Sequence, residues 1–345
     1  MTPRIHLAPG YSISRVIKGG WHLAGGHGAI DPDSALRDMA SFVDAGVTTF
    51  DCADIYTGVE ALIGRFRATY PSYAKRLQVQ TKFVPDLSDL AVIGRRGVEQ
   101  AIDRSLVRLR LEQLDVVQFH WWDFSVPRHV EVALELERLR QAGKIRHIGV
   151  TNFDAIHLAQ LTAAGVSILT HQLQYSLVDD RPNHGMVEFC RAQGISLLCY
   201  GTVCGGFLSE RWLDQPEPYD ELANRSLTKY KLIIDDAGGW DAFQRLLRVL
   251  RGIAARHGTD IATVASRAIL DRPQVAGVIV GAVSARHLDS NSRIGDVQLD
   301  ATDAAAIGGI TSRHGGPHGD VYELERDRTG IHGRIMKYEL NSAPR

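Results

Sequence analysis

The chain has 345 residues, of which 44% are hydrophobic and 23% are charged, and its formal net charge is −1 at pH 7. This composition is typical of a soluble globular protein with a large core. Acidic and basic residues are interspersed, so we expect no surface that binds nucleic acid. The sequence contains no run of about 18 apolar residues, so no membrane span is predicted. No linker or low-complexity segment divides the chain, which indicates a single domain over residues 1–345.

The N-terminal segment and the cysteines both favour a cytoplasmic protein. Residues 1–16 lack the continuous apolar core of a secretory signal. The cysteines form no CxxC pair, and a reduced thiol beside an apolar run behaves as a small hydrophobic group. We therefore expect no disulfides, with a catalytic cysteine as a minor alternative. The cysteines are Cys52, Cys190, Cys199 and Cys204.

The predicted elements begin with a β-hairpin and continue as an alternation of helices and strands. Residues 5–13 alternate apolar and polar side chains around an Ala-Pro-Gly turn, which predicts the hairpin. A helix follows from Asp31, with apolar residues on one face and Gly46 as its stop. Similar apolar stripes predict helices over residues 98–109 and 132–139. The strand candidates are residues 15–20, 47–51, 77–82, 114–120, 145–152, 167–172, 195–201 and 275–281.

Eight strand candidates with helical patterns between them predict an α/β fold, a closed (β/α)8 TIM barrel with an N-terminal β-hairpin and long loops at its carboxyl face. The alternative is an open doubly wound sheet. That fold usually carries GxGxxG after its first strand, and neither GGWHLAGG nor GTVCGG has this spacing. The period of two along the strands also points Gln78, Gln80 and Gln118 inward, so these amides would need partners in the core.

Polar residues stand at or just beyond the ends of three strand candidates. Because active sites of barrels form at the carboxyl ends of the strands, we expect these side chains to meet in one site. Each also has a structural interpretation on its own, since an aspartate near a lysine is commonly an ion pair and a lone histidine is commonly a core or cap residue. The four residues are Asp51, Tyr56, Lys82 and His120.

The segment FDCADIY, together with Lys82 and His120, resembles the aspartate, tyrosine, lysine and histidine tetrad of the aldo-keto reductase family. Further segments resemble the cofactor contacts of that family, in the family's order, and the resemblance covers most of the chain. It implies an oxidoreductase that interconverts a carbonyl (an aldehyde or ketone) and an alcohol by direct hydride transfer. These further segments are GVTNF at 149–153, Gln172, Tyr200 and 278–291.

The tetrad suits the reduction of a carbonyl, which needs a proton donor at the oxygen that gains charge. Tyr56 is expected to act as general acid and base. Its ordinary pKa of about 10 makes it a reluctant donor. The ammonium of Lys82 is expected to lower that pKa, and Asp51 is expected to hold the lysine charged. His120 is expected to position the carbonyl and to donate a hydrogen bond to its oxygen.

The resemblance implies NADPH/NADP+ as cofactor, with NADH/NAD+ as the alternative. Thr151, Asn152 and Gln172 could bind the nicotinamide carboxamide, and Tyr200 could stack on the ring. Asn152 could instead cap a helix, and Tyr200 could belong to the core. Backbone amides of residues 201–208 could hold the pyrophosphate, or the glycines there could form a plain turn. The predicted cofactor residues are Gly20, Trp21, Asp51, Thr151, Asn152, Gln172, Tyr200, Gly201, Thr202, Val203, Cys204, Gly206, Leu208, Gly281, Val283, Arg286, His287 and Asn291.

The residues expected near an adenosine 2′-phosphate depart from the commoner family pattern. Many relatives carry lysine or arginine early in the loop after the last strand, whereas residues 281–284 of this chain read Gly-Ala-Val-Ser. Arg286 follows and could still supply a fork of donors to the phosphate. The sequence therefore favours NADPH over NADH.

Aromatic residues beside the tetrad predict a pocket for a ring-shaped or extended small-molecule carbonyl. The two tryptophans after His120 could instead pack under the loops. The resemblance implies that segments 201–240 and 314–345 cover the barrel mouth. The predicted substrate residues are Trp21, His22, Tyr56, His120, Trp121 and Trp122.

No metal site is predicted. His314, His318 and His332 lie near acidic residues, but the Gly-Gly-Pro segment 315–317 prevents a helical ligand pair. Two other functions stay open: a cofactor-binding protein that senses redox state for a partner, and a lyase that uses Lys82 as a Schiff-base nucleophile. The sequence indicates no membrane or nucleic-acid partner and leaves the oligomeric state open.

Overall fold

Eight parallel strands close into a barrel in the computed structural model, which describes residues 2–25, 30–219, 222–282, 284–313 and 315–341. The strands are β3 Val16–Gly19, β4 Thr49–Asp51, β5 Gln78–Phe83, β6 Leu114–Phe119, β7 Ile145–Thr151, β8 Ile168–Gln174, β9 Ser196–Tyr200 and β10 Val275–Gly281. They follow one another around the barrel in chain order, and β10 pairs with β3 to close it. The predicted barrel is confirmed, and each strand falls on a predicted run.

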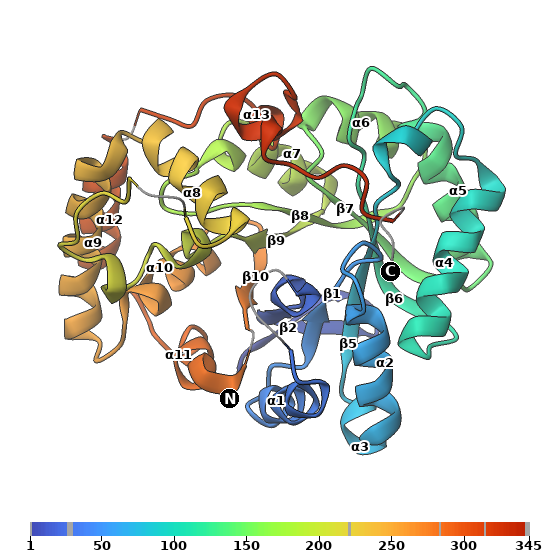
Figure 1. Cartoon of the computed structure of the whole chain (residues 1–345), viewed down its shortest axis with the longest axis horizontal. Helices are drawn as coiled ribbons and strands as arrows, with labels where there is room; N and C mark the ends of the chain where they lie inside the picture. The colour runs from blue at the N-terminus through green and yellow to red at the C-terminus, as the bar shows by residue number, and fades with distance from the viewer. Residues whose placement is uncertain (1, 26–29, 220–221, 283, 314, 342–345) are drawn as a thin grey trace.

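Helices form the outer layer of the barrel (Figure 1). The first of them, α1 (Pro32–Asp44), is capped by Asp31, which accepts hydrogen bonds from the backbone of Asp33 and Ser34. Gly46 follows with a φ of 87°, a conformation that suits glycine, and the helix ends before it as predicted. The other long helices are α2 Val59–Thr69, α4 Arg95–Leu109, α5 His129–Gln141, α6 Ala155–Ala163, α7 Met186–Gln193, α8 Arg225–Asp236, α9 Gly239–Arg256, α10 Ile261–Leu270 and α12 Ala301–Thr311.

The predicted N-terminal hairpin closes the amino-terminal end of the barrel. Its strands, β1 (Arg4–Ala8) and β2 (Tyr11–Ser14), pair antiparallel. The side chains of Tyr11 and Ile13 are 2% and 0% exposed, so folding removes the apolar surface of both from water. The buried side chains that they meet inside the barrel are Ile17, Val116, Leu198 and Ala276.

The glutamines predicted to point inward find partners in part. Gln80 and Gln118 are 0% exposed, and Gln118 Nε2 donates to Gln80 Oε1 at 3.3 Å. Gln78 lies at the amino-terminal end of β5, where its Oε1 accepts hydrogen bonds from Arg4 and Thr48 at 3.0 Å each. Among the described residues, Gln80 Nε2 and Gln118 Oε1 have no hydrogen-bond partner. Gln80 and Gln118 are therefore partners of each other through a single hydrogen bond, and the expectation of core partners is met only for that bond.

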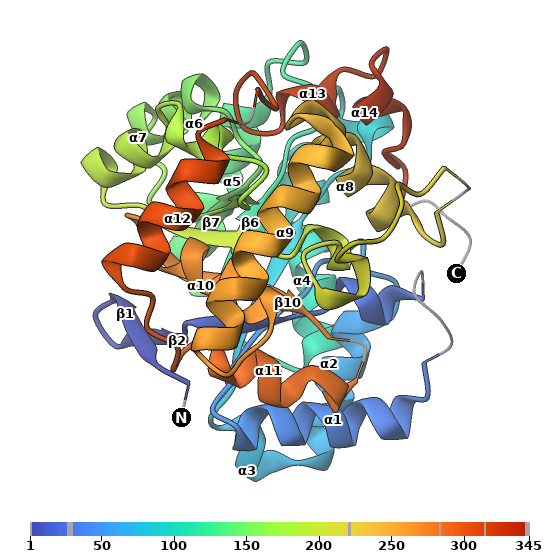
Figure 2. The same cartoon turned by 90° about the vertical axis from the view of Figure 1, so that its left-hand side faces the viewer.

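Two segments cover the carboxyl face of the barrel (Figure 2). One contains α8, and the other is the tail after α12, with the short helices α13 (Glu323–Arg326) and α14 (Ile331–Arg334). Side chains from both segments line the cavity described below. The described parts of 201–240 and 314–345 thus lie where the long loops were expected.

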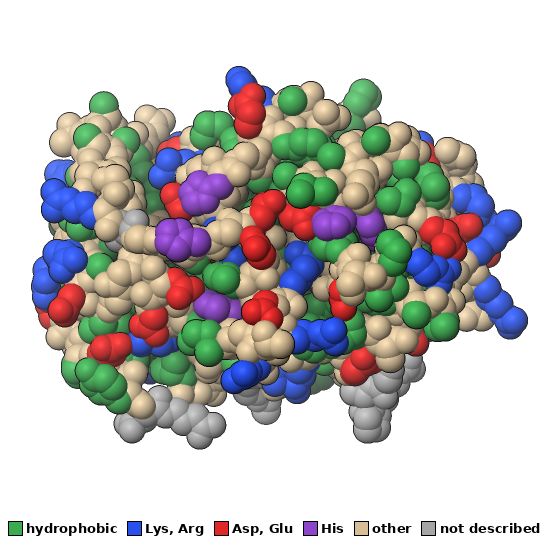
Figure 3. Space-filling view, turned by 90° about the horizontal axis from the view of Figure 1, so that it is seen from above, with side chains coloured by type: hydrophobic (Ala, Val, Ile, Leu, Met, Phe, Trp, Pro, Cys, Tyr) green, Lys and Arg blue, Asp and Glu red, His purple; other side chains and the backbone are tan. Residues whose placement is uncertain are grey.

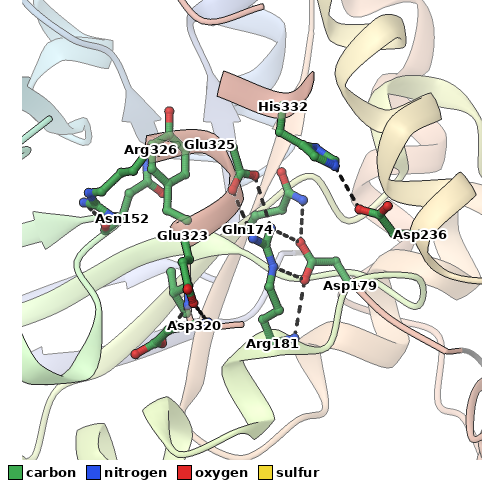
Figure 4. A network of polar contacts seen from close by, with 12 residues as sticks. Asn152, Gln174, Asp179, Arg181, Asp236, Asp320, Glu323, Glu325, Arg326 and His332 are labelled. Carbon is green, nitrogen blue, oxygen red and sulfur yellow. Dashed lines mark hydrogen bonds and ion pairs between the residues drawn. The ribbon is translucent and has the colours of Figure 1, made fainter. Parts of the chain in front are cut away.

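Buried polar contacts anchor the tail to the barrel (Figure 4). Arg181, in the loop after β8, donates to Asp179 at 2.9 and 2.8 Å and to Glu325 of α13 at 3.0 and 3.1 Å. Near the end of the tail, Asn341 Nδ2 donates to Val84 O at 2.8 Å, beside the end of β5. Two separate attachments therefore hold the tail across the barrel mouth.

The surface seen in Figure 3 is mixed in character, and the cysteines lie inside the protein. On the face seen from above, acidic, basic and hydrophobic side chains are interspersed (Figure 3). All the cysteines are buried and free. Within the described ranges, no helix is long and apolar enough to cross a membrane.

Candidate active site

A cavity of about 300 Å³ lies at the carboxyl ends of the strands, and all four residues of the predicted tetrad line it. Asp51 ends β4 and Lys82 lies in β5. His120 follows β6, and Tyr56 lies in the loop between β4 and α2. Three adjacent strands therefore bring these side chains together from distant positions in the sequence.

Lys82 and Asp51 form a buried ion pair. Lys82 Nζ donates to the two carboxylate oxygens at 2.9 and 2.7 Å and to Cys52 O at 2.9 Å. The Lys82 and Asp51 side chains are 6% and 5% exposed. Burial on its own would lower the pKa of Lys82, but Asp51 and Tyr56 raise that pKa above its ordinary value. Lys82 is therefore held in its charged form.

Tyr56 lies beside this ion pair. Lys82 Nζ is 4.9 Å from the centroid of the Tyr56 ring, and Trp21 meets the ring edge-on at a centroid distance of 5.1 Å. Burial raises the pKa of Tyr56, the charge of Lys82 lowers it, and the net direction is upward. The expected lowering of this pKa is not met, because the removal of water outweighs the neighbouring charge. Tyr56 therefore keeps its proton at neutral pH.

The backbone of the next strand holds His120. His120 Nδ1 lies 3.1 Å from Thr151 O, and because a carbonyl oxygen only accepts, Nδ1 carries the proton. Burial and the charge of Arg326 lower the pKa of His120 to about 3, so the ring is neutral. Nε2, which has no partner among the described residues, is then an acceptor. This differs from the expected donation of a hydrogen bond, since the donor proton is already used on Thr151.

Four predicted cofactor residues line the same cavity, namely Thr151, Asn152, Gln172 and Tyr200. Gln172 Nε2 donates to Asp51 Oδ1 at 2.7 Å, which leaves its Oε1 as an acceptor. The Tyr200 hydroxyl donates to Asn152 Oδ1 at 2.8 Å, which leaves the amide N–H groups of Asn152 as donors. One acceptor and one donor match a carboxamide, which offers an NH₂ group and a carbonyl oxygen.

The remaining predicted cofactor residues fall into groups by position. Trp21, Gly201, Thr202, Val203 and Gly281 also line the cavity. Gly20, Cys204 and Gly206 adjoin lining residues in the chain but are not part of the lining, and Leu208 lies outside it, three residues after the lining residue Gly205. Arg286, His287 and Asn291 lie outside the lining, in the 3-10 turn Ala285–His287 and in α11 (Leu288–Arg293). Val283 lies outside the described residues.

These residues fit a nicotinamide dinucleotide. Asn152 and Gln172 can hold its carboxamide, and a side chain added at Gly206 would have no atom within 4 Å, so the backbone there is open. The buried Nδ2 of Asn291 has no partner among the described residues and is available as a donor. The glycines at 201 and 205 are covered by the ring of Tyr230, so their small size serves the packing of α8.

The structure separates the two tryptophans that follow His120. Trp122 lines the cavity and meets the His120 ring edge-on at a centroid distance of 4.3 Å. Trp121 is 0% exposed, does not line the cavity, and donates from Nε1 to the carbonyls of Asp123 and Val126. Trp122 therefore lies where a substrate contact was predicted, whereas Trp121 packs in the core and does not. Successive side chains leave an extended segment in opposite directions, which explains the difference.

The other two predicted substrate residues, Trp21 and His22, both line the cavity. Trp21 is 38% exposed at the rim. His22 packs against Gly281 so closely that a side chain at position 281 would overlap its ring. The close contact with the His22 ring thus requires glycine at 281, and His22, which follows β3, packs against the end of β10.

Residues from the cover of the barrel also reach the cavity, and sequence reasoning missed them. Arg225 and Lys229 lie one turn apart on α8, and Lys229 Nζ is 5.3 Å from the centroid of the Tyr200 ring. Tyr322 and Met336 reach it from the tail. The spacing of four residues on a helix could have indicated that Arg225 and Lys229 share a face. Nothing in the sequence marks the tail residues, because their partners are far away along the chain.

The histidines considered as metal ligands do not form a site in the described part of the chain. No group of three or more His, Cys, Asp or Glu side chains could hold a metal ion there. His332 instead pairs with Asp236 at 2.9 Å. His314 lies outside the described residues.

Comparisons with known proteins agree on one family. The model described as Aldo/keto reductase family matches residues 15–311. Aldo-keto reductase YhdN of Bacillus subtilis is 27% identical over 314 residues, which cover 87% of this chain and 91% of that protein. L-glyceraldehyde 3-phosphate reductase of Escherichia coli is 25% identical over 296 residues, which cover 82% of this chain and 84% of that protein.

Two further likenesses concern length and fold. Flagellar radial spoke protein 5 of Chlamydomonas reinhardtii is 28% identical over 298 residues, so the match covers 69% of this chain but only 56% of that relative. Among solved structures, glycerol dehydrogenase AKR11B4 from Gluconobacter oxydans has a TM-score of 0.75 at 24% identity, covering 90% of this chain and 95% of that chain. This last likeness supports the barrel fold.

Proposed function

We propose that this chain, which belongs to the aldo/keto reductase family, is a nicotinamide-dependent oxidoreductase that interconverts a carbonyl and an alcohol. The proposal rests on the position of Tyr56 beside the buried pair of Lys82 and Asp51, in a cavity that offers partners for a carboxamide. The nicotinamide, when bound, would supply hydride to the carbonyl carbon or accept it from the alcohol. NADPH is the proposed form, with Arg286 as the proposed contact of its extra phosphate.

Tyr56 supplies the proton in this scheme. Burial raises its pKa, so the phenol keeps its proton until a substrate oxygen gains negative charge. The proton then moves from the Tyr56 hydroxyl to that oxygen, and the ammonium of Lys82 stabilises the phenolate that is left. Asp51 keeps the ammonium in place. In the opposite direction, the phenolate takes the proton of the alcohol.

His120 has the role of orienting the alcohol. Its Nδ1 proton is used on Thr151 O, so only a group with a proton to donate can bond to Nε2. A hydroxyl has such a proton and a carbonyl does not. The alcohol has a single hydroxyl proton, which it shares with Tyr56 during proton transfer. We therefore assign to His120 a hydrogen bond from the bound alcohol outside that step, with Trp122 packed against the His120 ring.

The charge of Lys82 argues against the lyase alternative. Schiff-base chemistry needs a neutral amine as nucleophile. Asp51 instead raises the pKa of Lys82 above its ordinary value and engages Nζ with both carboxylate oxygens. A protein that only senses redox state would use the same cofactor-binding residues as an oxidoreductase. Measured turnover of a carbonyl distinguishes the oxidoreductase from the redox sensor.

The proposal is tested by following NADPH absorbance with aldehydes, ketosteroid-like polycycles and keto-sugars. Wild-type protein is expected to turn over at least one of these classes. Tyr56→Phe removes only a hydroxyl and is expected to lose roughly 10²–10⁴-fold in turnover with NADPH affinity nearly unchanged. The matched control is Tyr11→Phe, which removes a hydroxyl at the opposite end of the barrel.

Two outcomes would count against this scheme. Turnover retained by Tyr56→Phe would refute Tyr56 as the general acid and base. Very slow turnover by the wild-type protein on every carbonyl, with NADPH bound tightly, would favour the redox-sensing function.

A further inference from the structure

Arg326, at the end of α13 in the tail, places a guanidinium between two aromatic rings. Its central carbon lies 4.4 Å from the centroid of the Phe124 ring and 5.3 Å from that of Tyr322. Such contacts stabilise a cation that has lost part of its water. Burial lowers the pKa of Arg326, yet an arginine remains charged at any pH at which the protein is folded. A permanent positive charge is thus built in beside the candidate active site.

One nitrogen of this guanidinium links the residues that follow the two adjacent strands β6 and β7. Arg326 Nη2 donates to Trp121 O at 3.2 Å and also to Asn152 O, as Figure 4 shows for Asn152. Trp121 directly follows His120, and Asn152 directly follows Thr151. A second link, from His120 Nδ1 to Thr151 O at 3.1 Å, lies one residue earlier on each strand. The ends of β6 and β7 are therefore joined twice, once by the tail.

Asn152 needs such support because its backbone is unusual. Its φ is 62°, in the left-handed region that asparagine adopts more readily than most residues but at some cost. Its side chain accepts from the Tyr200 hydroxyl at 2.8 Å, which turns the amide N–H groups toward the cavity that Asn152 lines. Fixing the carbonyl of Asn152 fixes the direction of this side chain.

The neighbouring carboxylate does not compete for Arg326. Glu325 is already bonded by Arg181 at 3.0 and 3.1 Å, and Lys229 lies 3.6 Å from it. The bonds that Arg326 makes are therefore with the two backbone carbonyls. A charged donor bonded to a carbonyl is stronger than a neutral one, which suits a contact that has to hold a strained residue.

We propose that Arg326 is a positioning residue: from the tail, it holds the backbone that presents Asn152 and His120 to the cofactor and the substrate. This inference rests on the proposed function, because it assigns Asn152 to the carboxamide of the cofactor. It makes the tail a part of the site's assembly in addition to its cover. The tail keeps its other attachments, through Glu325 and Asn341, when Arg326 is replaced.

Cofactor affinity tests the proposal with three variants of the full chain. Arg326→Met removes both hydrogen bonds and is expected to weaken NADPH binding roughly 10-fold to 100-fold, measured by fluorescence titration. Arg326→Lys keeps the charge, but its ammonium ends a shorter side chain than the Nη2 group that makes both bonds, so an intermediate loss is expected. Arg328→Met is the matched control, since Arg328 is bonded to Asp123 at 3.2 Å and does not line the cavity, so unchanged affinity is expected.

A merely structural role gives a different pattern. It predicts a lower melting temperature for Arg326→Met with NADPH affinity unchanged at 25 °C, and that result would overturn the proposal. If Arg326→Met does not fold, the affinity of Arg326→Lys decides, because an ammonium at this position preserves the charge between the rings. Wild-type affinity in Arg326→Lys would then overturn the proposal.

The route through Asn152 is tested by a double variant. Asn152→Gly removes the side chain and tolerates the positive φ. If Arg326 acts through Asn152, adding Arg326→Met to Asn152→Gly is expected to weaken NADPH binding by no more than about twofold further. A full additive loss would show that Arg326 does not act through Asn152.

Hydrogen exchange supplies a readout that needs no cofactor. Arg326→Met is expected to speed amide exchange severalfold in segments 120–122 and 150–153, with segments 337–341 and the α4 region unchanged. Unchanged exchange at the two strand ends would overturn the proposal. Failure of the proposed function is read separately, from wild-type protein that binds no NADPH or reduces no carbonyl.

Discussion

Lys82 and Tyr56 show how burial affects a cation and a phenol in one site. Burial penalises the charged form of each residue. Lys82 stays charged because Asp51 contacts its Nζ with both oxygens, at 2.9 and 2.7 Å. A Tyr56 phenolate has only the charge of Lys82 beside it, and Asp51 shares that charge. The proton therefore stays on Tyr56 at rest, and in the proposed scheme Lys82 would stabilise the phenolate when a substrate takes the proton.

The choice between NADPH and NADH is predicted from one exposed residue, Arg286. NADPH is expected to bind more tightly than NADH, and Arg286→Ala is expected to weaken NADPH binding roughly tenfold while leaving NADH unchanged, since a charge-assisted hydrogen bond is lost. Fluorescence titration with both reduced cofactors measures this. Arg293→Ala, which removes an exposed arginine paired with Asp289 at 3.3 Å, is the control. Equal affinities of the wild-type protein for NADPH and NADH would contradict the prediction.

Single residues of the site were predictable from sequence only in part. The tetrad was predictable, because each member lies near or just after the end of a recognisable strand and the set resembles a family motif. The direction of the pKa of Tyr56 was not, since it depends on how completely the loops exclude water from the ring. The tautomer of His120 was not either, because the carbonyl of Thr151 that fixes it comes from another strand.

At the scale of elements, the alternation of side chains explains the fate of neighbouring tryptophans. His120 and Trp122 face the cavity, while Trp121 between them faces the core. The period of two that places Lys82 and His120 in the barrel thus extends beyond the end of β6. Applied to Trp121, it would have predicted the core position from sequence alone.

The attachment of the tail depends on Arg181, which is 2% exposed between two carboxylates that are 0% exposed. Arg181→Met is expected to destabilise the protein by roughly 3–5 kcal/mol, because it leaves Asp179 and Glu325 buried without their main partner. Urea denaturation at pH 7, followed by fluorescence, measures this loss.

A control for that loss is an arginine pair on the surface. Arg191 bonds Glu188 three residues earlier, and their side chains are 64% and 69% exposed. Arg191→Met is expected to change the free energy of unfolding by less than about 0.5 kcal/mol, because water screens such pairs. Losses of similar size for the Arg181 and Arg191 variants would contradict the assigned role of the buried network.

For the whole molecule, buried titratable groups predict a loss of stability in acid. Burial lowers the pKa of His120 and of His171 to about 3, against an ordinary 6.5. Above pH 6.5 both the folded and the unfolded chain carry these rings neutral. As pH falls from 6.5 to about 3, only the unfolded chain takes up the protons, so the free energy of unfolding decreases across that window.

Glu325 adds to this loss at lower pH. Although its burial acts in the opposite direction, Arg181 and Lys229 lower its pKa to about 2, against an ordinary 4.5. Its stabilising contribution is therefore complete above pH 4.5 and is lost as pH falls toward 2. Asp54 acts in the opposite direction, because burial raises its pKa well above the ordinary value. The histidine effect is therefore read from the difference between wild-type protein and a histidine variant between pH 6.5 and 4.5.

Urea denaturation over a pH series measures this dependence. His171→Gln keeps an acceptor for the backbone N–H of Phe153, which His171 Nε2 now accepts at 3.2 Å, and it is expected to flatten the slope between pH 6.5 and 4.5. His6→Gln changes an exposed histidine and is expected to keep the wild-type slope. Equal slopes for wild-type protein and His171→Gln between pH 6.5 and 4.5 would contradict the prediction.

The fold as a whole was predictable because each strand and helix carries its own local pattern. The eight apolar runs and the capped helix after Asp31 each appear where the sequence indicated them. The contributions of Tyr322 and Arg326 were not predictable, because they arise where the tail packs across the mouth, and no local pattern records a contact with Phe124 or Asn152. Local periodicity predicts the barrel, and long-range packing completes the site.

The hairpin at the amino-terminal end has a consequence for the order of events in a reaction. Tyr11 and Ile13 fill that end of the barrel, and α8 and the tail narrow the other. Two reactants that share one entrance cannot pass each other. If a cofactor and a substrate bind in this cavity as proposed, the closed end of the barrel leads to the expectation that the one lying deeper binds first and leaves last.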